Sequence, residues 1–248
     1  MASFADHFSK RSPDYARYRP GYPDALFDFV AELAPGRALA WDCATGSGQA
    51  AAGLAGRFET VLATDASFGQ IRSAVRHPAI RYAAATAEAA PLASGSAAAV
   101  TSAQALHWFD RPRFWEEVRR VLVPGGVVAI WSYHGFHVTP EVEAVVHRLY
   151  RDVVGPYWPP ERAIVERGYQ ELEFPFDRVD PPGLVLEKRW DLAALVGYLR
   201  TWSATQRYEA ALGADPIPLV AKDLEEAWGP PETVRPFRWD LDILLGRK

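Results

Sequence analysis

At 248 residues and 49% hydrophobic composition, the chain is long enough for one α/β domain with insertions or with a small cap. Its net charge of −4 argues against broad nucleic-acid affinity, and no apolar run approaches the roughly 18 residues of a membrane span, so neither partner is expected. The first residues lack the apolar core of a secretory signal, and the single cysteine, Cys43, suits a reducing compartment, which predicts a cytoplasmic location.

The first predicted elements are a helix at residues 23–34 and a strand that follows it. The helix has regular apolar spacing and ends before a Pro-Gly pair. The stretch LAWDCATGSGQAA, residues 39–51, then indicates a strand that ends in Asp42, a turn of small residues and the start of a helix at 48–57. Such a turn lets the backbone approach a ligand closely.

The second predicted strand, residues 60–65, ends in another acid. Asp65 follows Gly46 by 19 residues, a spacing that places its carboxylate to accept hydrogen bonds from ribose hydroxyls. The turn and this acid therefore predict a nucleoside-bearing cofactor. No Lys-Ser or Lys-Thr pair follows the glycines, which excludes a P-loop.

The charge of Asp42 distinguishes two such cofactors. Gly46, Gly48 and Ala51 also fit the fingerprint of a dinucleotide-binding turn, but a carboxylate there would repel a pyrophosphate. S-adenosylmethionine carries a cationic ammonium and a cationic sulfonium, and a neighbouring acid attracts both. We therefore expect S-adenosylmethionine, with a nicotinamide-dependent oxidoreductase as the alternative.

The next elements alternate between helix and strand. A helix at 67–76 precedes a third strand at 80–86, and a fourth strand at 97–104 precedes an amphipathic helix at 113–123. A Pro-Gly-Gly turn separates that helix from a fifth strand at 127–133. This order predicts a mostly parallel sheet, whose ligands sit beyond the carboxyl ends of the strands. The polar residues expected at those ends are Asp42, Asp65, Thr86 and Gln104.

Several separated motifs resemble those of a known family. D-x-A-T-G-S-G-Q at 42–49 resembles motif I of the class I S-adenosylmethionine-dependent methyltransferases, with Ala44 in place of the first glycine. An alanine is expected to be tolerated there if it avoids a positive φ. VTSAQALHWFD at 100–110 and EEVRRVLVPGGVVAIW at 116–131 resemble the signatures of small-molecule members. With YARYRPGYP at 15–23, the chain looks like the trans-aconitate methyltransferase group, whose N-terminal segment folds over cofactor and substrate.

The resemblance implies roles for individual residues around the cofactor. Asp42 would face the methionine ammonium, directly or through water, and Asp65 would bind both ribose hydroxyls. Ala66 would touch the adenine, and Thr86 stands where the family commonly has an aspartate for the adenine amino group. The implied cofactor-binding residues are Asp42, Ala44, Thr45, Gly46, Gly48, Asp65, Ala66, Thr86, Ala87, Glu88, Ala103 and Gln104.

His107 and Trp108 follow the fourth strand and are expected to border the space where methyl donor and acceptor meet. Three roles remain open for His107: general base, hydrogen-bond donor to an anionic substrate, and packing residue that orders the loop. A carboxylate acceptor needs no base, so the absence of another clear base favours such an acceptor. His107 is the candidate catalytic residue, and the candidate substrate-binding residues are Tyr15, Arg19, Trp108 and Tyr133. No metal site is expected.

Beyond residue 134 the sequence predicts a cap and the end of the sheet. A helix at 138–154 precedes a proline-rich loop, and two further helices are expected at 191–203 and 218–228. The segments 184–190 and 236–246 are expected to be the antiparallel strands that close a seven-stranded sheet.

The predicted fold is one α/β domain over residues 1–248: a Rossmann-like, seven-stranded, mostly parallel sheet with helices on both faces, an antiparallel last strand and helical cap elements. Its expected parts are an N-terminal lid (1–24), a cofactor-binding core (25–135), a cap (136–235) interleaved with strand 184–190, and the last strand (236–248). The expected function is methyl transfer from S-adenosylmethionine to a small-molecule acceptor by in-line displacement, driven mainly by positioning. A non-catalytic S-adenosylmethionine-binding protein is a further alternative.

Overall fold

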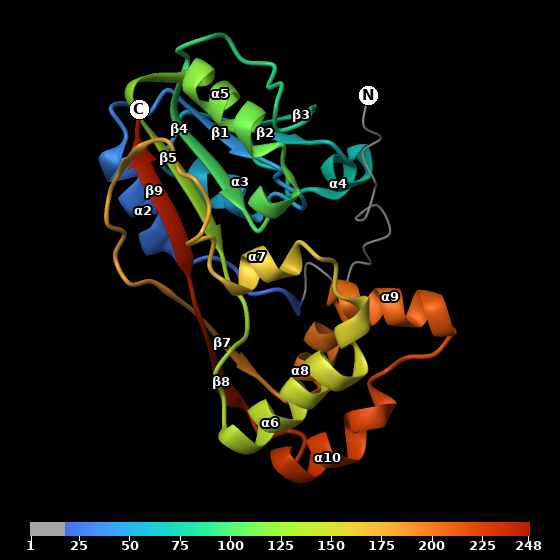
Figure 1. Ribbon diagram of the computed structural model, residues 1–248. Helices are drawn as coiled ribbons and strands as arrows, with labels where there is room; N and C mark the ends of the chain where they lie inside the picture. Colours follow the sequence, from blue (N-terminus) through green and yellow to red (C-terminus); the bar gives the residue numbers. More distant parts are fainter. Residues whose placement is uncertain (1–17) are drawn as a thin grey trace.

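A central sheet, the helices around it and a helical cap make up the part of the chain that the structure, a computed structural model, describes, residues 18–248 (Figure 1). Within these residues, none of the helices combines the length and the apolar character of a membrane span. The predicted Tyr15 and most of the predicted lid, residues 1–17, lie outside the described residues.

The central sheet is built from β1 (Leu39–Cys43), β2 (Thr60–Asp65), β3 (Ile80–Ala84), β4 (Ala97–Ala103), β5 (Leu122–Ser132), β6 (Asp177–Arg178) and β9 (Asp242–Arg247). The order of the strands across the sheet is β3-β2-β1-β4-β5-β9-β6. The first five run parallel to one another, and β9 runs antiparallel to both β5 and β6. The predicted Rossmann-like sheet with an antiparallel last strand is confirmed.

Four helices accompany the first five strands: α2 (Asp24–Leu33), α3 (Gln49–Ala55), α4 (Phe68–Ser73) and α5 (Arg111–Val121). Alternate residues of a strand point to opposite faces of the sheet, so each strand supplies two apolar surfaces. α2 and α3 pack on the face that carries Val61 and Ala129. The other face, with Trp41 and Ile130, packs against α5 through side chains that include Phe114.

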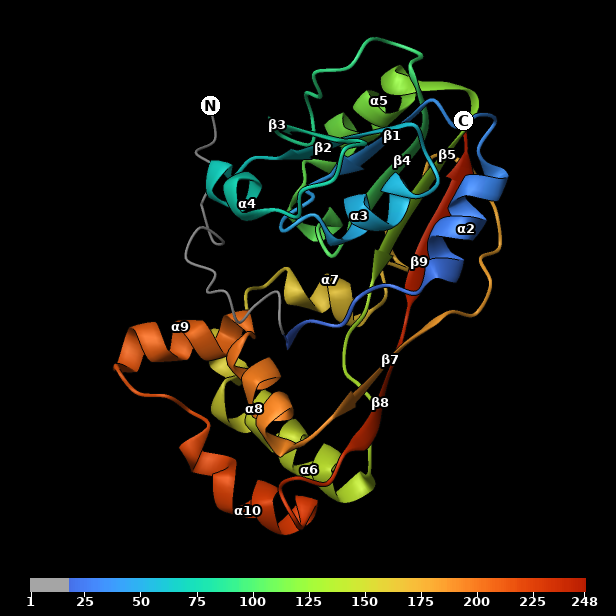
Figure 2. The same ribbon diagram turned by 180° about the vertical axis from the view of Figure 1, so that it is seen from behind.

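The cap consists of α6 (Pro140–Arg148), a π-helical turn η2 (Leu149–Val153), η3 (Gly155–Tyr157), α8 (Leu192–Arg200), α9 (Ser203–Leu212), α10 (Pro218–Trp228) and a ribbon of β7 (Val185–Trp190) and β8 (Arg235–Asp240). Figures 1 and 2 show it beyond the carboxyl ends of β4 and β5, with the short α7 (Arg162–Glu166) between sheet and cap. Its own core is rich in aromatic rings, among them Trp190, Tyr198, Phe237 and Trp239. The cap therefore has its own apolar core beside the edge of the sheet where ligands are expected.

The expected antiparallel pairing of 184–190 with 236–246 is confirmed, but its expected place at the edge of the main sheet is wrong. β7 pairs with β8 in a separate two-stranded sheet, and the chain then passes Leu241 to enter the main sheet as β9. The segment 236–246 thus serves two sheets, and the seventh strand is the two-residue β6. The physical reason is burial: Trp190 and Phe237, whose rings lie 5.1 Å apart, pack in the core of the cap.

Candidate active site

The turn between β1 and α3 forms the floor of the site. The backbone N–H of Thr45 donates to the carbonyl of Thr64 at the end of β2 (2.9 Å), and that of Gly48 donates to the carbonyl of Thr45 (2.9 Å). Gly46 and Gly48 have φ values of +56° and +83°, a region that favours glycine. A Cβ placed on Gly46 would meet no atom of residues 18–248 within 4 Å, so among these residues the backbone at Gly46 faces open space.

Ala44 does not meet the condition under which an alanine is expected to be tolerated at this position. Its φ is +54°, in the left-handed region. A side chain with a Cβ costs about 1–2 kcal/mol there relative to glycine. The bonds that hold the next residues to the end of β2 impose this conformation on the turn.

Asp42 lies beneath the turn and is completely buried. Its Oδ2 accepts a hydrogen bond from the hydroxyl of Thr45 (2.6 Å), and its Oδ1 accepts one from the hydroxyl of Thr101 on β4 (2.8 Å). Burial raises the pKa of Asp42 to about 6, although both hydroxyls oppose that rise. With no exposed surface, the carboxylate supports the turn from inside. Of the two contacts expected with an ammonium, direct or through water, the direct one does not fit this geometry.

Asp65 lies at the carboxyl end of β2, half-buried and beside the turn. Its Oδ2 accepts a hydrogen bond from the backbone N–H of Gly46 (2.9 Å), and its Oδ1 accepts one from that of Ser67 (2.8 Å). The two bonds fix the orientation of the carboxylate at the edge of the open space over Gly46. Ala66 follows at the same edge and is also half-buried.

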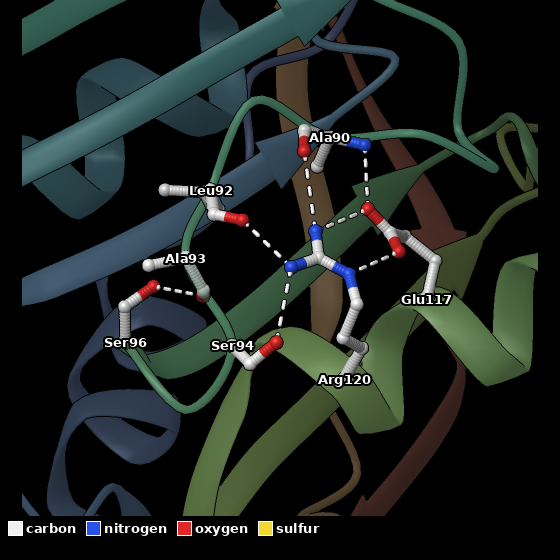
Figure 3. A network of polar contacts seen from close by, with 7 residues as sticks. All are labelled: Ala90, Leu92, Ala93, Ser94, Ser96, Glu117 and Arg120. Carbon is white, nitrogen blue, oxygen red and sulfur yellow. Dashed lines mark hydrogen bonds and ion pairs between the residues drawn. The ribbon is translucent and has the colours of Figure 1, made fainter.

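The loop from β3 to β4 carries Thr86, Ala87 and Glu88, and α5 holds it in place (Figure 3). Glu117 accepts a hydrogen bond from the backbone N–H of Ala90 (2.6 Å) and forms an ion pair with Arg120 (2.7 Å). The guanidinium of Arg120 donates to the carbonyls of Leu92 (2.7 Å) and Ala90 (3.2 Å). The guanidinium of Arg120 and the carboxylate of Glu117 thus give hydrogen-bond partners to backbone groups of this loop, which lies outside any helix or strand.

We expect Arg120→Ala to lower the free energy of unfolding by about 1–2 kcal/mol, because several charge-assisted hydrogen bonds are lost from a partly exposed side chain. The freed loop should also weaken S-adenosylmethionine binding a few-fold. Urea unfolding and titration calorimetry measure the two effects. Arg113→Ala is the matched control, because Arg113 lies on the exposed side of the same helix. Equal stability and affinity in the two variants would contradict the role of this loop.

The end of β4 brings Ala103 and Gln104 to the edge of the sheet. Gln104 has a φ of +57°, donates its backbone N–H to the carbonyl of Trp131 (2.8 Å) and donates its side-chain amide to the carbonyl of Tyr133 (3.0 Å). The chain then turns into a short 3-10 helix, η1 (Leu106–Trp108), which carries His107. The strained residue therefore redirects the chain and exposes this segment to the space between sheet and cap.

His107 is held by a buried tyrosine. Its Nδ1 lies 3.0 Å from the hydroxyl of Tyr169, which follows α7 and is 1% exposed. Burial, with smaller contributions from Arg162 and Arg111, lowers the pKa of His107 to about 3. The imidazole is therefore neutral at physiological pH and a weak base.

A cavity of about 740 Å³ lies between the sheet and the cap. Gln104, His107, Trp108 and Tyr133 line it from the sheet side, and Arg19 lines it from the segment before α2. Rings of the cap form the opposite wall: Tyr150, Trp158, Tyr198 and Trp202. The cavity size suits a small molecule. Among the described residues, no cluster of histidine, cysteine and acidic side chains could hold a metal ion.

The structure thus gathers the predicted residues at two neighbouring places. Asp42, residues 44–48 and Asp65 form the turn and its acidic edge. Gln104, His107, Trp108, Tyr133 and Arg19 line the cavity. The sequence analysis did not identify Tyr150, Arg162 or Tyr169, which come from the helix at 140–153, from α7 and from the turn after α7. Their only signal was an arginine and aromatic rings around a proline-rich loop.

Comparison with known proteins gives consistent matches. Residues 41–130 match a family described as a methyltransferase domain. A protein of Dictyostelium discoideum, named as a methyltransferase, is 34% identical over 91% of this chain and 87% of its own length. A protein of Aspergillus candidus with a methyltransferase name is 33% identical over 52% of this chain and 44% of its own length.

Solved structures agree with the sequence matches. A structure from Anaeromyxobacter dehalogenans, described as a type II methyltransferase, superposes with a TM-score of 0.86 and 48% identity, over 92% of this chain and 97% of that one. A Bacillus halodurans structure with a methyltransferase description gives a TM-score of 0.52 at 20% identity, over 91% of this chain and 98% of that one. The second match shows a shared fold.

Proposed function

Because the chain belongs to the class I S-adenosylmethionine-dependent methyltransferases, we propose that it methylates a carboxylate oxygen of a small molecule bound in the cavity between sheet and cap. Family membership makes the chain an enzyme that uses S-adenosylmethionine. Family membership argues against both alternatives from the sequence, a nicotinamide-dependent oxidoreductase and a binding protein without catalysis. The small carboxylated acceptor and the assignment to the trans-aconitate group are our proposals, as is a cytoplasmic location.

The turn after β1 fits S-adenosylmethionine. The open space over Gly46 leaves room for a ligand against the backbone, and the carboxylate of Asp65 borders it. We assign the ribose to Asp65, the adenine side to Ala66 and the Thr86–Glu88 loop, and the methionine side to residues 44–48. The buried charge of Asp42 favours the cationic end from below. When bound there, S-adenosylmethionine supplies an electrophilic methyl group on a sulfonium.

The residues at the end of β4 position the acceptor. Gln104 is fixed by two hydrogen bonds to the β5 segment, so it offers a rigid edge between cofactor turn and cavity. Trp108 and Tyr133 add ring surfaces at that edge. Holding the reacting atoms in line at about 3 Å supplies several kcal/mol, up to roughly 7–11 in the best model reactions. Methyl transfer then requires correct placement more than acid or base chemistry.

The proposed acceptor rests on the surroundings of His107, whose Nδ1 is engaged by the hydroxyl of Tyr169 and whose burial lowers the pKa of the imidazole. A phenol, an alcohol or an ammonium requires a base, and a pKa of about 3 makes His107 a poor one. The two cavity carboxylates are already engaged: Glu143 accepts from the backbone of Val138 (2.7 Å), and Glu166 accepts from the hydroxyl of Tyr150. Two further imidazoles line the cavity: His134, whose Nδ1 lies 3.3 Å from Asp242, and His147 on α6. A carboxylate acceptor is deprotonated before it enters the cavity and requires no base from any of these side chains.

With S-adenosylmethionine at saturation, so that titration of Asp42 does not limit cofactor binding, we expect methyl transfer to a carboxylate acceptor to be independent of pH between about 6 and 9, with His107→Gln within about threefold of the wild-type rate. The reason is that neither acceptor nor His107 changes protonation in that range. Release of S-adenosylhomocysteine, measured with a panel of carboxylic acids, phenols and amines, tests this. A preference for amines or phenols would contradict the proposed acceptor. An inflection near pH 6–7 that His107→Gln removes would restore the base role.

A further inference from the structure

Arg162, the first residue of α7, extends into the cavity and is held on several sides. Its Nε donates a hydrogen bond to the hydroxyl of Tyr150 (2.8 Å). The guanidinium carbon lies 4.8 Å from the ring centre of Trp158 and 5.6 Å from that of Tyr150. Stacking and the Nε bond fix the plane of the guanidinium before any ligand arrives.

The outer end of this guanidinium has no protein partner. Among residues 18–248, neither Nη1 nor Nη2 of Arg162 makes a hydrogen bond, and the nearest carboxylate oxygen, on Glu166, lies 3.9 Å from Nε. Glu166 is engaged with Tyr150. The side chain is 21% exposed, so its two free nitrogens open on the cavity while the rest is covered. A planar fork with two free donors matches the two oxygens of a carboxylate.

The other cavity arginines differ from Arg162. Arg19 donates through Nη2 to the carbonyl of Thr201 (3.1 Å). Arg151 is exposed to solvent at the rim. Arg162 and His107 line the same cavity, His107 from the segment after β4 and Arg162 from α7. A molecule held in the cavity can therefore lie against both side chains.

We propose that Arg162 selects the acceptor of this enzyme by binding its carboxylate through Nη1 and Nη2, while the rings of Tyr150, Trp158 and Trp202 pack against a flat apolar part of the same molecule. The packing of the rings supports the apolar part of this proposal. The ring centre of Tyr150 lies 4.7 Å from that of Trp158 and 5.5 Å from that of Trp202, which gives a continuous aromatic wall beside the guanidinium. The acceptor class is thus an aromatic or conjugated carboxylic acid. Its methyl ester is neutral and loses the pairing with Arg162, which favours product release.

The inference rests on the proposed function for its place in the reaction, but binding can test it without turnover. We would measure binding of trans-cinnamate and of its neutral amide by titration calorimetry, with S-adenosylhomocysteine present so that no methyl is transferred. The variants are Arg162→Gln, which removes the charge, and Arg162→Lys, which keeps the charge and loses the fork. Arg167→Gln is the matched control, because Arg167 is exposed nearby, pairs with Glu171 and does not line the cavity.

The wild type should bind trans-cinnamate at least about tenfold more tightly than the amide. Arg162→Gln should lose about 10- to 100-fold in affinity for the acid only, Arg162→Lys should recover part of it, and Arg167→Gln should match the wild type. Equal binding of acid and amide by the wild type, or unchanged acid binding in Arg162→Gln, would overturn the inference. Tighter binding of phenylphosphonate than of trans-cinnamate would overturn the carboxylate assignment.

The two proposals fail in distinguishable ways. If acids bind in an Arg162-dependent manner and no ester forms with S-adenosylmethionine, the carboxylate oxygen is not the methyl acceptor and the anion site stands. If esters form and Arg162→Gln leaves both KM and kcat unchanged, the proposed function stands and the role of Arg162 is wrong.

Discussion

Asp65→Ala should weaken S-adenosylmethionine binding by at least about 100-fold, close to 3 kcal/mol. Two losses combine in this variant. The assigned bonds to the ribose hydroxyls are charge-assisted, and each contributes about 1.5–3 kcal/mol. The backbone N–H groups of Gly46 and Ser67 also lose their acceptor, so the turn under the cofactor is less well fixed. Titration calorimetry with S-adenosylmethionine measures the total.

The fold should survive this change, because Asp65 is half-buried at the end of β2 rather than inside the sheet. We expect a loss of about 1 kcal/mol in the free energy of unfolding without ligand. Glu59→Ala, which removes an exposed carboxylate just before the same strand, should change neither quantity. An unchanged affinity in a folded Asp65→Ala protein would remove the ribose assignment and, with it, the orientation of the cofactor that we propose.

The turn after β1 and its acidic edge could be predicted because their signals are local in the sequence. A strand end, a small-residue turn and a helix start lie within residues 39–51, and the parallel sheet that follows from the alternation of elements brings Asp65 beside Gly46. Local geometry at Ala44 could not be read in the same way. Its positive φ follows from hydrogen bonds to the neighbouring strand.

The cap could be predicted only as a set of elements. The helix expected at 218–228 is present as α10, but α9 was missed and β7 was assigned to the wrong sheet. An aromatic residue on a helix fits a core and a cavity wall equally well in the sequence. Tyr198 shows why, since it packs in the cap core and also lines the cavity.

The sequence analysis did not foresee the burial of Asp42, and the expected attraction between its charge and a cationic ligand stays a prediction. The sequence placed Asp42 at the tip of β1, facing the ligand, whereas the structure buries it between the hydroxyls of Thr45 and Thr101. The partner on β4 is 59 residues away, so the bond depends on strand order rather than on local pattern. A carboxylate in such a place costs stability, which makes its purpose testable.

Asp42→Asn should stabilise the protein without ligand by about 1–3 kcal/mol at pH 7.5. The folded pKa of about 6 exceeds the ordinary 3.8, so between these values the unfolded chain ionises Asp42 before the folded chain does, and stability falls as pH rises. Above pH 6 the buried carboxylate is ionised, and its full cost to the free energy of unfolding, about 3 kcal/mol, remains. An asparagine stays neutral and can still accept from one threonine hydroxyl and donate to the other.

Urea unfolding at several pH values measures this effect, and the difference between Asp42→Asn and wild type should disappear toward pH 4. Glu59→Gln, the exposed control, should follow the wild type at every pH. The same Asp42→Asn variant should bind S-adenosylmethionine about tenfold more weakly, because one charge–charge attraction across a layer of side chains contributes about 1–2 kcal/mol. A more stable protein with weaker binding is the expected signature of a carboxylate kept for its charge. Unchanged affinity would show that Asp42 only supports the turn.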